Sequence, residues 1–288
     1  MQDKICLITG ANAGIGQQTA LELAQMGATV VIVARDPQRG EAARAAIAAT
    51  TGNPRVELLQ ADFASPPSIQ AMATSFAARY DRLDVLVNNA GVYLTGRETT
   101  ADGLERTFAV NHLGYFMTTL LLWPSLLAAP SARVINLSSD AHRQAKLNLD
   151  DLQNERKYAG FRAYAQSKLA NVLFTYELDR RRGNAPVTVN AVHPGFVASN
   201  FGRNNRGVIG LVMTRLVPLF AKSVVEGAAT SVYLASSPEV AGVSGRYFVD
   251  CRPVKSAPQS YDRTAAERLW AVSEELTGLR LPSLAHTG

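Results

Sequence analysis

The stretch Thr9-Gly10-Ala11-Asn12-Ala13-Gly14-Ile15-Gly16 follows the apolar run Ile5–Thr9 and leads into a helical pattern over Gly16–Met26. Three glycines therefore stand at the turn between an expected strand and an expected helix. Glycines at such a turn let the backbone approach a pyrophosphate, and the helix N-terminus supplies oriented N–H groups with partial positive charge. The turn predicts a dinucleotide site. Its spacing differs from the usual G-x-G-x-x-G, and simple turn punctuation is the alternative.

Outward from this turn, short β-branched runs alternate with longer stretches of helical period. This alternation is typical of βαβ units and predicts an α/β fold of the doubly wound Rossmann type, with a seven-stranded, mostly parallel sheet and helices on both faces. The expected strands are Ile5–Thr9, Thr29–Ala34, Val56–Ala61, Val85–Asn88, Arg133–Leu137, Thr188–Val192 and Arg246–Val249. The expected helices are Gly16–Met26, Pro37–Thr50, Pro66–Tyr80, Gly103–Leu127, Phe161–Arg182, Val224–Ser236 and a C-terminal helix over Thr264–Leu276.

No linker or internal repeat interrupts this alternation, so we expect a single domain over residues 1–288. Two segments depart from the rhythm. Asp140–Ala159 is a polar insertion, and Ser199–Ser223 places glycines around the apolar cluster Val208–Leu219. Long loops in compact domains are often functional. We expect a substrate lid at about residues 199–223, with a helix packed on the core as the alternative.

Composition and charge limit the class of protein. The chain has 288 residues, of which 47% are hydrophobic and 18% are charged, the balance of an ordinary globular protein with a sizeable core. The net charge is +5, but the basic residues are scattered. The densest run, Arg180-Arg181-Arg182, precedes Gly183, as expected at a helix C-terminus. We therefore expect no nucleic-acid partner.

Targeting and metal-binding patterns do not occur in the sequence. The chain enters a strand pattern at once, and its longest apolar stretch, Tyr115–Ala129, is interrupted by polar residues and proline. We expect neither a signal peptide nor a membrane span. Cys6 and Cys251 lie far apart, and the four histidines show no ligand spacing. These features predict no disulfide and no metal site, and they favour a cytoplasmic location.

The end of the second expected strand bears on cofactor choice. Arg35 and Asp36 lie about twenty residues beyond the glycine-rich turn, where an acidic side chain binds the ribose of NAD and an arginine suits the 2′-phosphate of NADP. Arg35 comes first, and Asp36 before Pro37 equally suits the cap of the next helix. NADP(H) is therefore favoured, with NAD(H) as the alternative.

Tyr164 and Lys168 are separated by one helical turn in Tyr164-Ala165-Gln166-Ser167-Lys168, so a phenol and an ammonium share a helix face. A tyrosine of pKa about 10 is a poor base at neutral pH, and a neighbouring positive charge would favour its phenolate. Alone, such a pair is more often an ordinary contact on a helix surface. Its meaning depends on the other motifs.

Further polar motifs follow the expected strands, where ligands bind in sheets of this kind. They are Asn88-Asn89-Ala90-Gly91, Asn111, Ser138-Ser139 and Pro194-Gly195. In this order, together with the glycine-rich turn and the Tyr164 and Lys168 pair, they resemble the short-chain dehydrogenase/reductase family from about Lys4 to Val249. Each motif is weak alone, but the joint match is highly specific. The resemblance implies a nicotinamide-dependent oxidoreductase.

The resemblance assigns a role to each matching residue. It implies that Tyr164 is the general acid/base, that Lys168 binds the nicotinamide ribose and lowers the pKa of Tyr164, and that Ser139 hydrogen-bonds the substrate oxygen. Asn111 would hold a water that links Lys168 to solvent. The residues implied for the cofactor are Gly10, Asn12, Ala13, Gly14, Ile15, Gly16, Arg35, Asp62, Phe63, Asn89, Ala90, Gly91, Tyr164, Lys168, Pro194, Gly195, Val197 and Ser199.

Two positions depart from the family pattern. Ser199 stands where threonine is frequent, and Ala13 stands where NADP-binding members often carry a basic residue. The second departure leaves Arg35 as the phosphate partner. Family members commonly form dimers or tetramers through the helices that contain Leu120 and Tyr164, so the resemblance allows a homodimer or a homotetramer here.

A narrower likeness concerns four segments: Ser139-Asp140-Ala141-His142, Asp150–Tyr158, Ser167–Asn171 and Leu269-Trp270. They resemble the retinol-dehydrogenase-like branch, which includes reductases of bulky apolar carbonyls. This likeness implies hydride transfer between nicotinamide and a small-molecule carbonyl or alcohol. A non-catalytic NADP-binding sensor or scaffold protein is the alternative from another class. For His142, a structural place in the loop is favoured over substrate contact.

Overall fold

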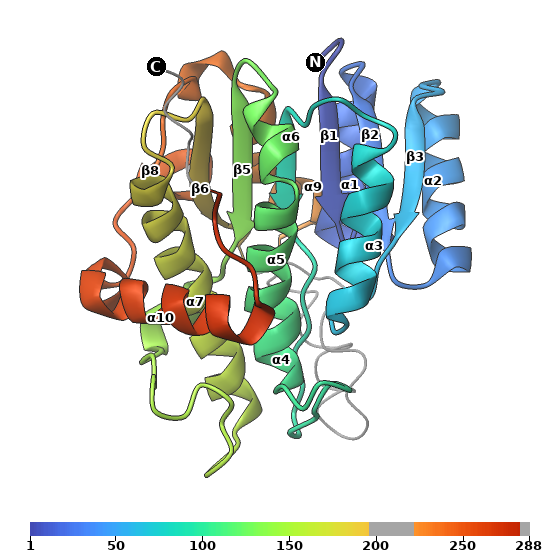
Figure 1. Ribbon diagram of the computed structural model, residues 1–288. Helices are drawn as coiled ribbons and strands as arrows, with labels where there is room; N and C mark the ends of the chain where they lie inside the picture. The colour runs from blue at the N-terminus through green and yellow to red at the C-terminus, as the bar shows by residue number, and fades with distance from the viewer. Residues whose placement is uncertain (196–221, 283–288) are drawn as a thin grey trace.

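The structure is a computed structural model that describes residues 1–195 and 222–282. Its centre is a sheet in the order β3-β2-β1-β4-β5-β6-β7-β8 (Figure 1). The strands are β1 (Ile5–Thr9), β2 (Thr29–Ala34), β3 (Val56–Gln60), β4 (Val85–Asn88), β5 (Ala132–Leu137), β6 (Val187–His193), β7 (Arg246–Val249) and β8 (Arg252–Val254). The strands β1 to β7 are parallel, whereas β8 pairs with β7 in the antiparallel direction. The doubly wound α/β fold is confirmed.

The expected number of seven strands is one too few. β8 has three exposed residues and lies at the sheet edge, where Asp250 and Cys251 form the turn from β7 with positive φ angles of 49° and 60°. A run this short that contains Pro253 carries no strand pattern, because proline cannot donate to a ladder and is tolerated at an edge. Only its pairing with β7 identifies it as a strand.

Helices cover both faces of the sheet. The helices outside the β4–β5 connection are α1 (Gly14–Gln25), α2 (Pro37–Thr51), α3 (Pro66–Ala77), α7 (Gly160–Arg181), α9 (Val224–Ser236) and α10 (Arg263–Thr277). The short helices elsewhere are η2 (Asp140–Gln144), η4 (Pro238–Val240) and η5 (Pro258–Tyr261). One core joins the sheet to α1, α2 and α9, and a second joins its other face to α3, α5, α6 and α7. In β1 the side chain of Leu7 enters the second core, while Cys6 and Ile8 enter the first.

The connection from β4 to β5 is not the single helix expected over Gly103–Leu127. It consists of α4 (Arg106–Phe108), the π-helical turn η1 (Ala109–Leu113), α5 (Gly114–Leu121) and α6 (Trp123–Leu127). Pro124 explains the break before α6, because proline belongs in the first turn of a helix. A π-turn inserted between helical segments often marks a functional position.

The C-terminal helix α10 lies across α7 and α5 (Figure 1). Its Trp270 ring stacks on Phe174 of α7 at 5.8 Å and meets Phe116 of α5 edge-on at 5.0 Å, and the guanidinium of Arg181 lies 4.6 Å from its centroid. The helix expected over Thr264–Leu276 is therefore present. An assembly through α5 and α7 would have to accommodate α10 of the same chain. Within the described ranges, no helix is both long enough and apolar enough to span a bilayer.

Candidate active site

The turn after β1 is packed through its backbone. Gly10 has φ +65°, and a Cβ there would lie 2.8 Å from Cα of Ala90. A Cβ on Gly16 would lie 2.8 Å from the carbonyl oxygen of Gly10 and would overlap the side-chain amide of Asn89. Glycine is therefore required for close approach at both positions. The neighbouring Asn12, Ala13, Gly14 and Ile15 are partly exposed.

Two side chains attach this turn to the end of β4. The Thr9 hydroxyl accepts hydrogen bonds from the backbone N–H groups of Asn89 (2.8 Å) and Ala90 (3.0 Å). The Asn89 side chain in return donates to the carbonyls of Thr9 (2.7 Å) and Gly10 (3.2 Å). Asn89, expected at the nicotinamide, thus uses its side-chain donor to fix the glycine-rich turn. Thr9 was not among the expected site residues.

The N-terminus of α1 fits a phosphate-bearing cofactor. Among residues 1–195 and 222–282 no side chain caps it, and its first turn carries no acidic residue. By contrast, Asp36 caps α2 with bonds of 2.9 and 3.0 Å to the N–H groups of Gln38 and Arg39. Uncapped N–H groups beside closely packed glycines can bind an anion. The turn therefore has the donor set that a dinucleotide pyrophosphate requires.

The residues expected around the adenosine differ in their exposure. Arg35 is exposed, and its guanidinium makes no ion pair within the part of the chain that the structure describes. Since Asp36 is the cap of α2, its carboxylate is already bound to backbone N–H groups. Asp62 is partly exposed and caps the N–H of Ala64 at 3.0 Å. Phe63 is buried in the core with its ring against Gly114, so only its backbone could serve adenine.

The two serines that follow β5 have different partners. The Ser138 hydroxyl is buried and donates to the backbone carbonyl of Lys168 at 2.8 Å, which joins the strand end to α7. The Ser139 hydroxyl faces the Tyr164 phenol, to which it is hydrogen-bonded, and accepts from the N–H of Ala141 at 3.3 Å. Of the two, Ser139 therefore stands beside Tyr164.

Tyr164 and Lys168 lie one turn apart on α7, with the Lys168 ammonium 5.7 Å from the centroid of the Tyr164 ring. Lys168 is buried and donates to the carbonyl of Leu137 at 3.1 Å. Burial raises the pKa of Tyr164 to about 12, and the hydrogen bond from Ser139 opposes that rise. Burial also lowers the pKa of Lys168 to about 7. Both changes disfavour the charged form, as desolvation requires.

The expected lowering of the Tyr164 pKa is therefore not produced by the protein's own groups. Loss of hydration around the phenolate outweighs the opposing hydrogen bond from Ser139. The consequence is chemical: a phenol with this pKa is protonated at neutral pH and can donate a proton.

Asn111 lies in the π-turn η1 and is completely buried. Its side chain accepts from the N–H of Val92 (2.8 Å) and donates to the carbonyl of Val92 (3.0 Å) and to the Ser167 hydroxyl (3.0 Å). A Cβ on Gly91 would lie 3.4 Å from Oδ1 of Asn111 and 3.7 Å from Nζ of Lys168. Asn111 is thus beside Lys168. Because the Asn111 side chain is already hydrogen-bonded to protein groups, a water at this place would have to be bound by the backbone of the π-turn.

The remaining expected residues follow β6. Pro194 and Gly195 come directly after His193, the last residue of this strand, and Gly195 has φ +84° with the Lys222 side chain against it. Val197 and Ser199 lie outside the described residues, as does almost all of the lid expected at about 199–223. Within the two described ranges, no group of three or more His, Cys, Asp or Glu could hold a metal ion.

Tyr93 was not expected at the site. Its ring meets that of Tyr164 edge-on, with 5.7 Å between centroids. It follows the Asn-Asn-Ala-Gly segment by two positions, and an aromatic side chain just past a strand end is the only sequence signal it offers. Val92, Tyr93 and Leu94 are all partly exposed, so this loop gives the site an apolar side.

Comparison with known proteins agrees with this geometry. The short chain dehydrogenase family matches residues 4–207. Retinol dehydrogenase 12 of Mus musculus is 44% identical over 277 residues, which cover 96% of this chain and 87% of the mouse protein. Retinol dehydrogenase 13 of Homo sapiens is 45% identical over 287 residues, which cover 98% of this chain and 86% of the human protein.

Solved structures show the same architecture. A protein of Mycobacterium paratuberculosis matches with a TM-score of 0.78 and 33% identity over 98% of this chain and 96% of its own. The Pseudomonas aeruginosa RhlG/NADP active-site complex matches with a TM-score of 0.69 and 26% identity over 86% of this chain and 94% of its own. The chain belongs to the short-chain dehydrogenase family, is an oxidoreductase, and is similar to the retinol dehydrogenases within that family.

Proposed function

We propose that this protein transfers a hydride between NADP(H) and the carbonyl or alcohol carbon of a bulky apolar small molecule. The observation that carries the proposal is the meeting of Ser139, Tyr164 and Lys168 after β5, in the same sheet whose strand β1 leads into the uncapped start of α1. A non-catalytic NADP sensor would need no hydroxyl hydrogen-bonded to a buried phenol. A bound nicotinamide would supply or accept the hydride.

In the direction of reduction, Tyr164 donates its phenolic proton to the carbonyl oxygen. Its pKa of about 12 keeps the proton on the phenol until negative charge develops on that oxygen. Ser139 donates a second hydrogen bond to the same oxygen, which stabilises the developing charge. In the direction of oxidation, the same phenol must first lose its proton, which is unfavourable without an added positive charge.

Lys168 holds the ribose hydroxyls and returns a proton toward Tyr164. A pKa of about 7 allows its amine to gain and lose a proton near neutral pH. The carbonyl of Leu137 orients the amine, and Asn111 stands on its other side across Gly91. The backbone of the π-turn would hold the water that connects this amine to solvent.

Four properties form part of the same proposal. The names of the retinol dehydrogenases support a bulky apolar substrate. The apolar loop Val92–Leu94 also supports it, because its Tyr93 ring meets the ring of Tyr164. A single domain over residues 1–288 is supported by one continuous sheet through the described strands. A cytoplasmic location is supported by two free cysteines. The assembly we propose is a homodimer or homotetramer.

The substitution Tyr164→Phe tests the chemistry. We expect kcat to fall at least about 1,000-fold, because proton transfer by a positioned side chain contributes roughly 100- to 10,000-fold. The affinity for NADPH should change less than about threefold. NADPH absorbance, followed with apolar aldehydes, ketones, retinoids and steroids, measures the first quantity, and fluorescence titration measures the second. The matched control is Tyr80→Phe, which removes a phenol near the end of α3. A Tyr164→Phe enzyme with full turnover would exclude this mechanism.

The substitution Arg35→Ala tests the cofactor preference. An exposed guanidinium without an ion pair is available to a 2′-phosphate, so we expect NADPH to bind roughly 10- to 100-fold more weakly and NADH to be unaffected. Arg44→Ala on α2, where Arg44 pairs with Glu41, is the control. A wild-type preference for NADH would make NAD(H) the cofactor, and an unchanged NADPH to NADH ratio in Arg35→Ala would show that Arg35 does not bind the 2′-phosphate.

A further inference from the structure

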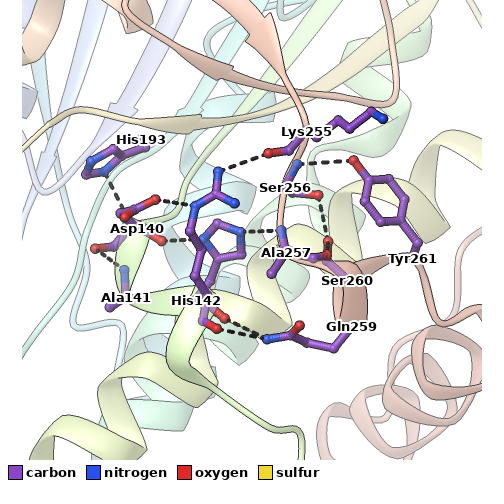
Figure 2. A network of polar contacts seen from close by, with 12 residues as sticks. Asp140, Ala141, His142, His193, Lys255, Ser256, Ala257, Gln259, Ser260 and Tyr261 are labelled. Atoms are coloured by element: carbon purple, nitrogen blue, oxygen red, sulfur yellow. Dashed lines mark hydrogen bonds and ion pairs between the residues drawn. The ribbon is translucent and has the colours of Figure 1, made fainter.

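His142 is buried in η2, the short helix that directly follows Ser139 (Figure 2). One ring nitrogen, Nδ1, lies 2.6 Å from the backbone carbonyl oxygen of Ser139. The other, Nε2, accepts the backbone N–H of Ala257 at 3.0 Å. The imidazole therefore joins two segments that lie 115 positions apart in the chain.

These two partners determine the tautomer. A carbonyl oxygen can only accept, so Nδ1 carries the proton, and a backbone N–H can only donate, so Nε2 is unprotonated. The imidazole is neutral, and its burial lowers its pKa below the ordinary value. A second proton on the imidazole would leave two donors, Nε2–H and the N–H of Ala257, facing each other and would break this hydrogen bond.

The segment that contains Ala257 is itself anchored. The Ser256 hydroxyl lies 2.7 Å from the Tyr176 hydroxyl of α7 and 2.6 Å from the Ser260 hydroxyl, and the N–H of Ser256 donates to Tyr261 at 3.1 Å. Gln259 donates to the carbonyl of Ala145 at 2.8 Å, at the far end of η2, and to that of His142 at 3.4 Å (Figure 2). The loop after Ser139 is therefore held at both ends by residues 255–261.

Charged and titratable groups also face this loop. Arg143 pairs with Asp140 at 2.6 Å and donates to the carbonyl of Lys255 at 2.9 Å. His193 at the end of β6 accepts the N–H of Asp140 at 3.2 Å. The ring of Tyr247 lies 4.8 Å from that of His142. These contacts hold the outer part of the loop, whereas His142 is hydrogen-bonded to both Ser139 and Ala257.

We propose that His142 is a positioning residue: its Nδ1–H bond to the backbone carbonyl of Ser139 aligns the Ser139 hydroxyl with Tyr164 and the substrate oxygen, while its Nε2 bond attaches the chain segment after β8. This inference rests on the proposed function, since the alignment matters only for chemistry at that oxygen. His142 touches neither substrate nor cofactor in this role. Its effect reaches the site through the backbone of Ser139.

Three substitutions separate the two hydrogen bonds of His142. His142→Asn keeps a donor near the position of Nδ1, His142→Gln keeps an acceptor near that of Nε2, and His142→Leu keeps neither. If the bond to Ser139 positions the hydroxyl, His142→Asn retains kcat within about threefold of wild type, and the other two lose about 10- to 100-fold, since small misplacements cost that much. Equal losses in all three, or no loss in any, would overturn the proposal.

A stability control distinguishes positioning from loss of folding. All three variants should melt at a lower temperature, because each removes at least one hydrogen bond made by the buried imidazole. Asn53→Ala also removes two buried hydrogen bonds, to the carbonyls of Ala24 (2.9 Å) and Ala28 (2.8 Å) at the opposite edge of the sheet. It should lower the melting temperature and leave kcat unchanged. A decrease of kcat in Asn53→Ala equal to that in His142→Gln would make the effect one of stability, against the proposal.

A double substitution tests the route through Ser139. Once Ser139→Ala has removed the hydroxyl, its alignment has no further effect, so Ser139→Ala/His142→Leu should be as slow as Ser139→Ala within about threefold. If the loss of kcat in the double variant equals the product of the losses in the two single variants, His142 acts by another route.

A measurement without turnover keeps the two proposals separable. The N–H of Ala141 donates to the Ser139 hydroxyl, so its hydrogen exchange, observed by NMR, reports the position of that hydroxyl. We expect exchange at least about tenfold faster in His142→Gln and unchanged in His142→Asn. Unchanged exchange in His142→Gln would overturn the positioning role. If wild-type protein reduces no carbonyl and oxidises no alcohol, the proposed function fails, and the exchange rates alone decide the role of His142.

Discussion

Two regions at the carboxyl edge of the sheet serve the site by different means. The turn from β1 to α1 is built from backbone, with glycines in close contact and a helix N-terminus that no side chain caps. The region from β5 to α7 is built from buried side chains, in which Ser139, Tyr164 and Lys168 meet. A backbone site tolerates no added atoms, whereas a side-chain site depends on protonation and alignment. Substitutions in the first should therefore change cofactor binding, and those in the second should change chemistry.

The largest expected loss of cofactor affinity is that of Gly16→Val. Its side chain would overlap the amide of Asn89 and the carbonyl of Gly10, so the turn must move away from its position. We expect NADPH to bind at least about 100-fold more weakly, which corresponds to about 2.7 kcal/mol, and the free energy of unfolding to fall by roughly 1–3 kcal/mol. Titration calorimetry and urea unfolding measure these quantities. Gly96→Val is the control, since no atom lies within 4 Å of its added Cβ. Wild-type affinity in Gly16→Val would refute the backbone site.

The neighbouring serines provide the next comparison. Ser139→Ala removes a donor to the substrate oxygen, so we expect kcat to fall roughly 100-fold with NADPH affinity retained. Ser138→Ala removes the bond to the carbonyl of Lys168, so we expect the free energy of unfolding to fall by about 1 kcal/mol and kcat to fall less than about tenfold. Steady-state kinetics and denaturant unfolding of both variants test this. A reversed order of the two kcat losses would assign the substrate contact to Ser138.

The last comparison concerns stability and its dependence on pH. The pKa of Lys168 in the fold, about 7, lies below that of a free lysine, so between pH 7 and about 10 the unfolded chain binds more protons and stability increases with pH. Lys168→Met removes this dependence. We expect it to abolish turnover and to stabilise the fold at pH 7 by roughly 1–3 kcal/mol. The carbonyl of Leu137 keeps its bond from Asn171 at 3.0 Å.

Urea unfolding at several pH values measures this prediction, with Lys146→Met as the control because Lys146 is exposed. The control should retain the increase of stability between pH 7 and about 10 that Lys168→Met loses. A Lys168→Met protein that is less stable than wild type at pH 7 would show that the buried amine stabilises the fold.

The sheet was predictable because its strands are buried on both faces, which produces continuous apolar runs that need no knowledge of their neighbours. The boundaries of helices and strands were less predictable where no pattern of neighbouring residues marks them. The π-turn that contains Asn111 has the composition of an ordinary helix, and β8 has no strand pattern at all. For the site, order along the chain identified the residues around Tyr164, but not their partners. Asn89 and Asp36 proved to bind backbone groups of the protein.

The sequence by itself determined the doubly wound sheet, the glycine-rich turn and the family, because these depend on residue type, spacing and order. Only the tertiary structure decided that burial raises the pKa of Tyr164 while lowering that of Lys168. It also decided that His142 joins Ser139 to Ala257. Hydration and hydrogen bonding depend on which atoms surround a group, and those atoms come from β5, α7 and the segment after β8, which only packing brings together.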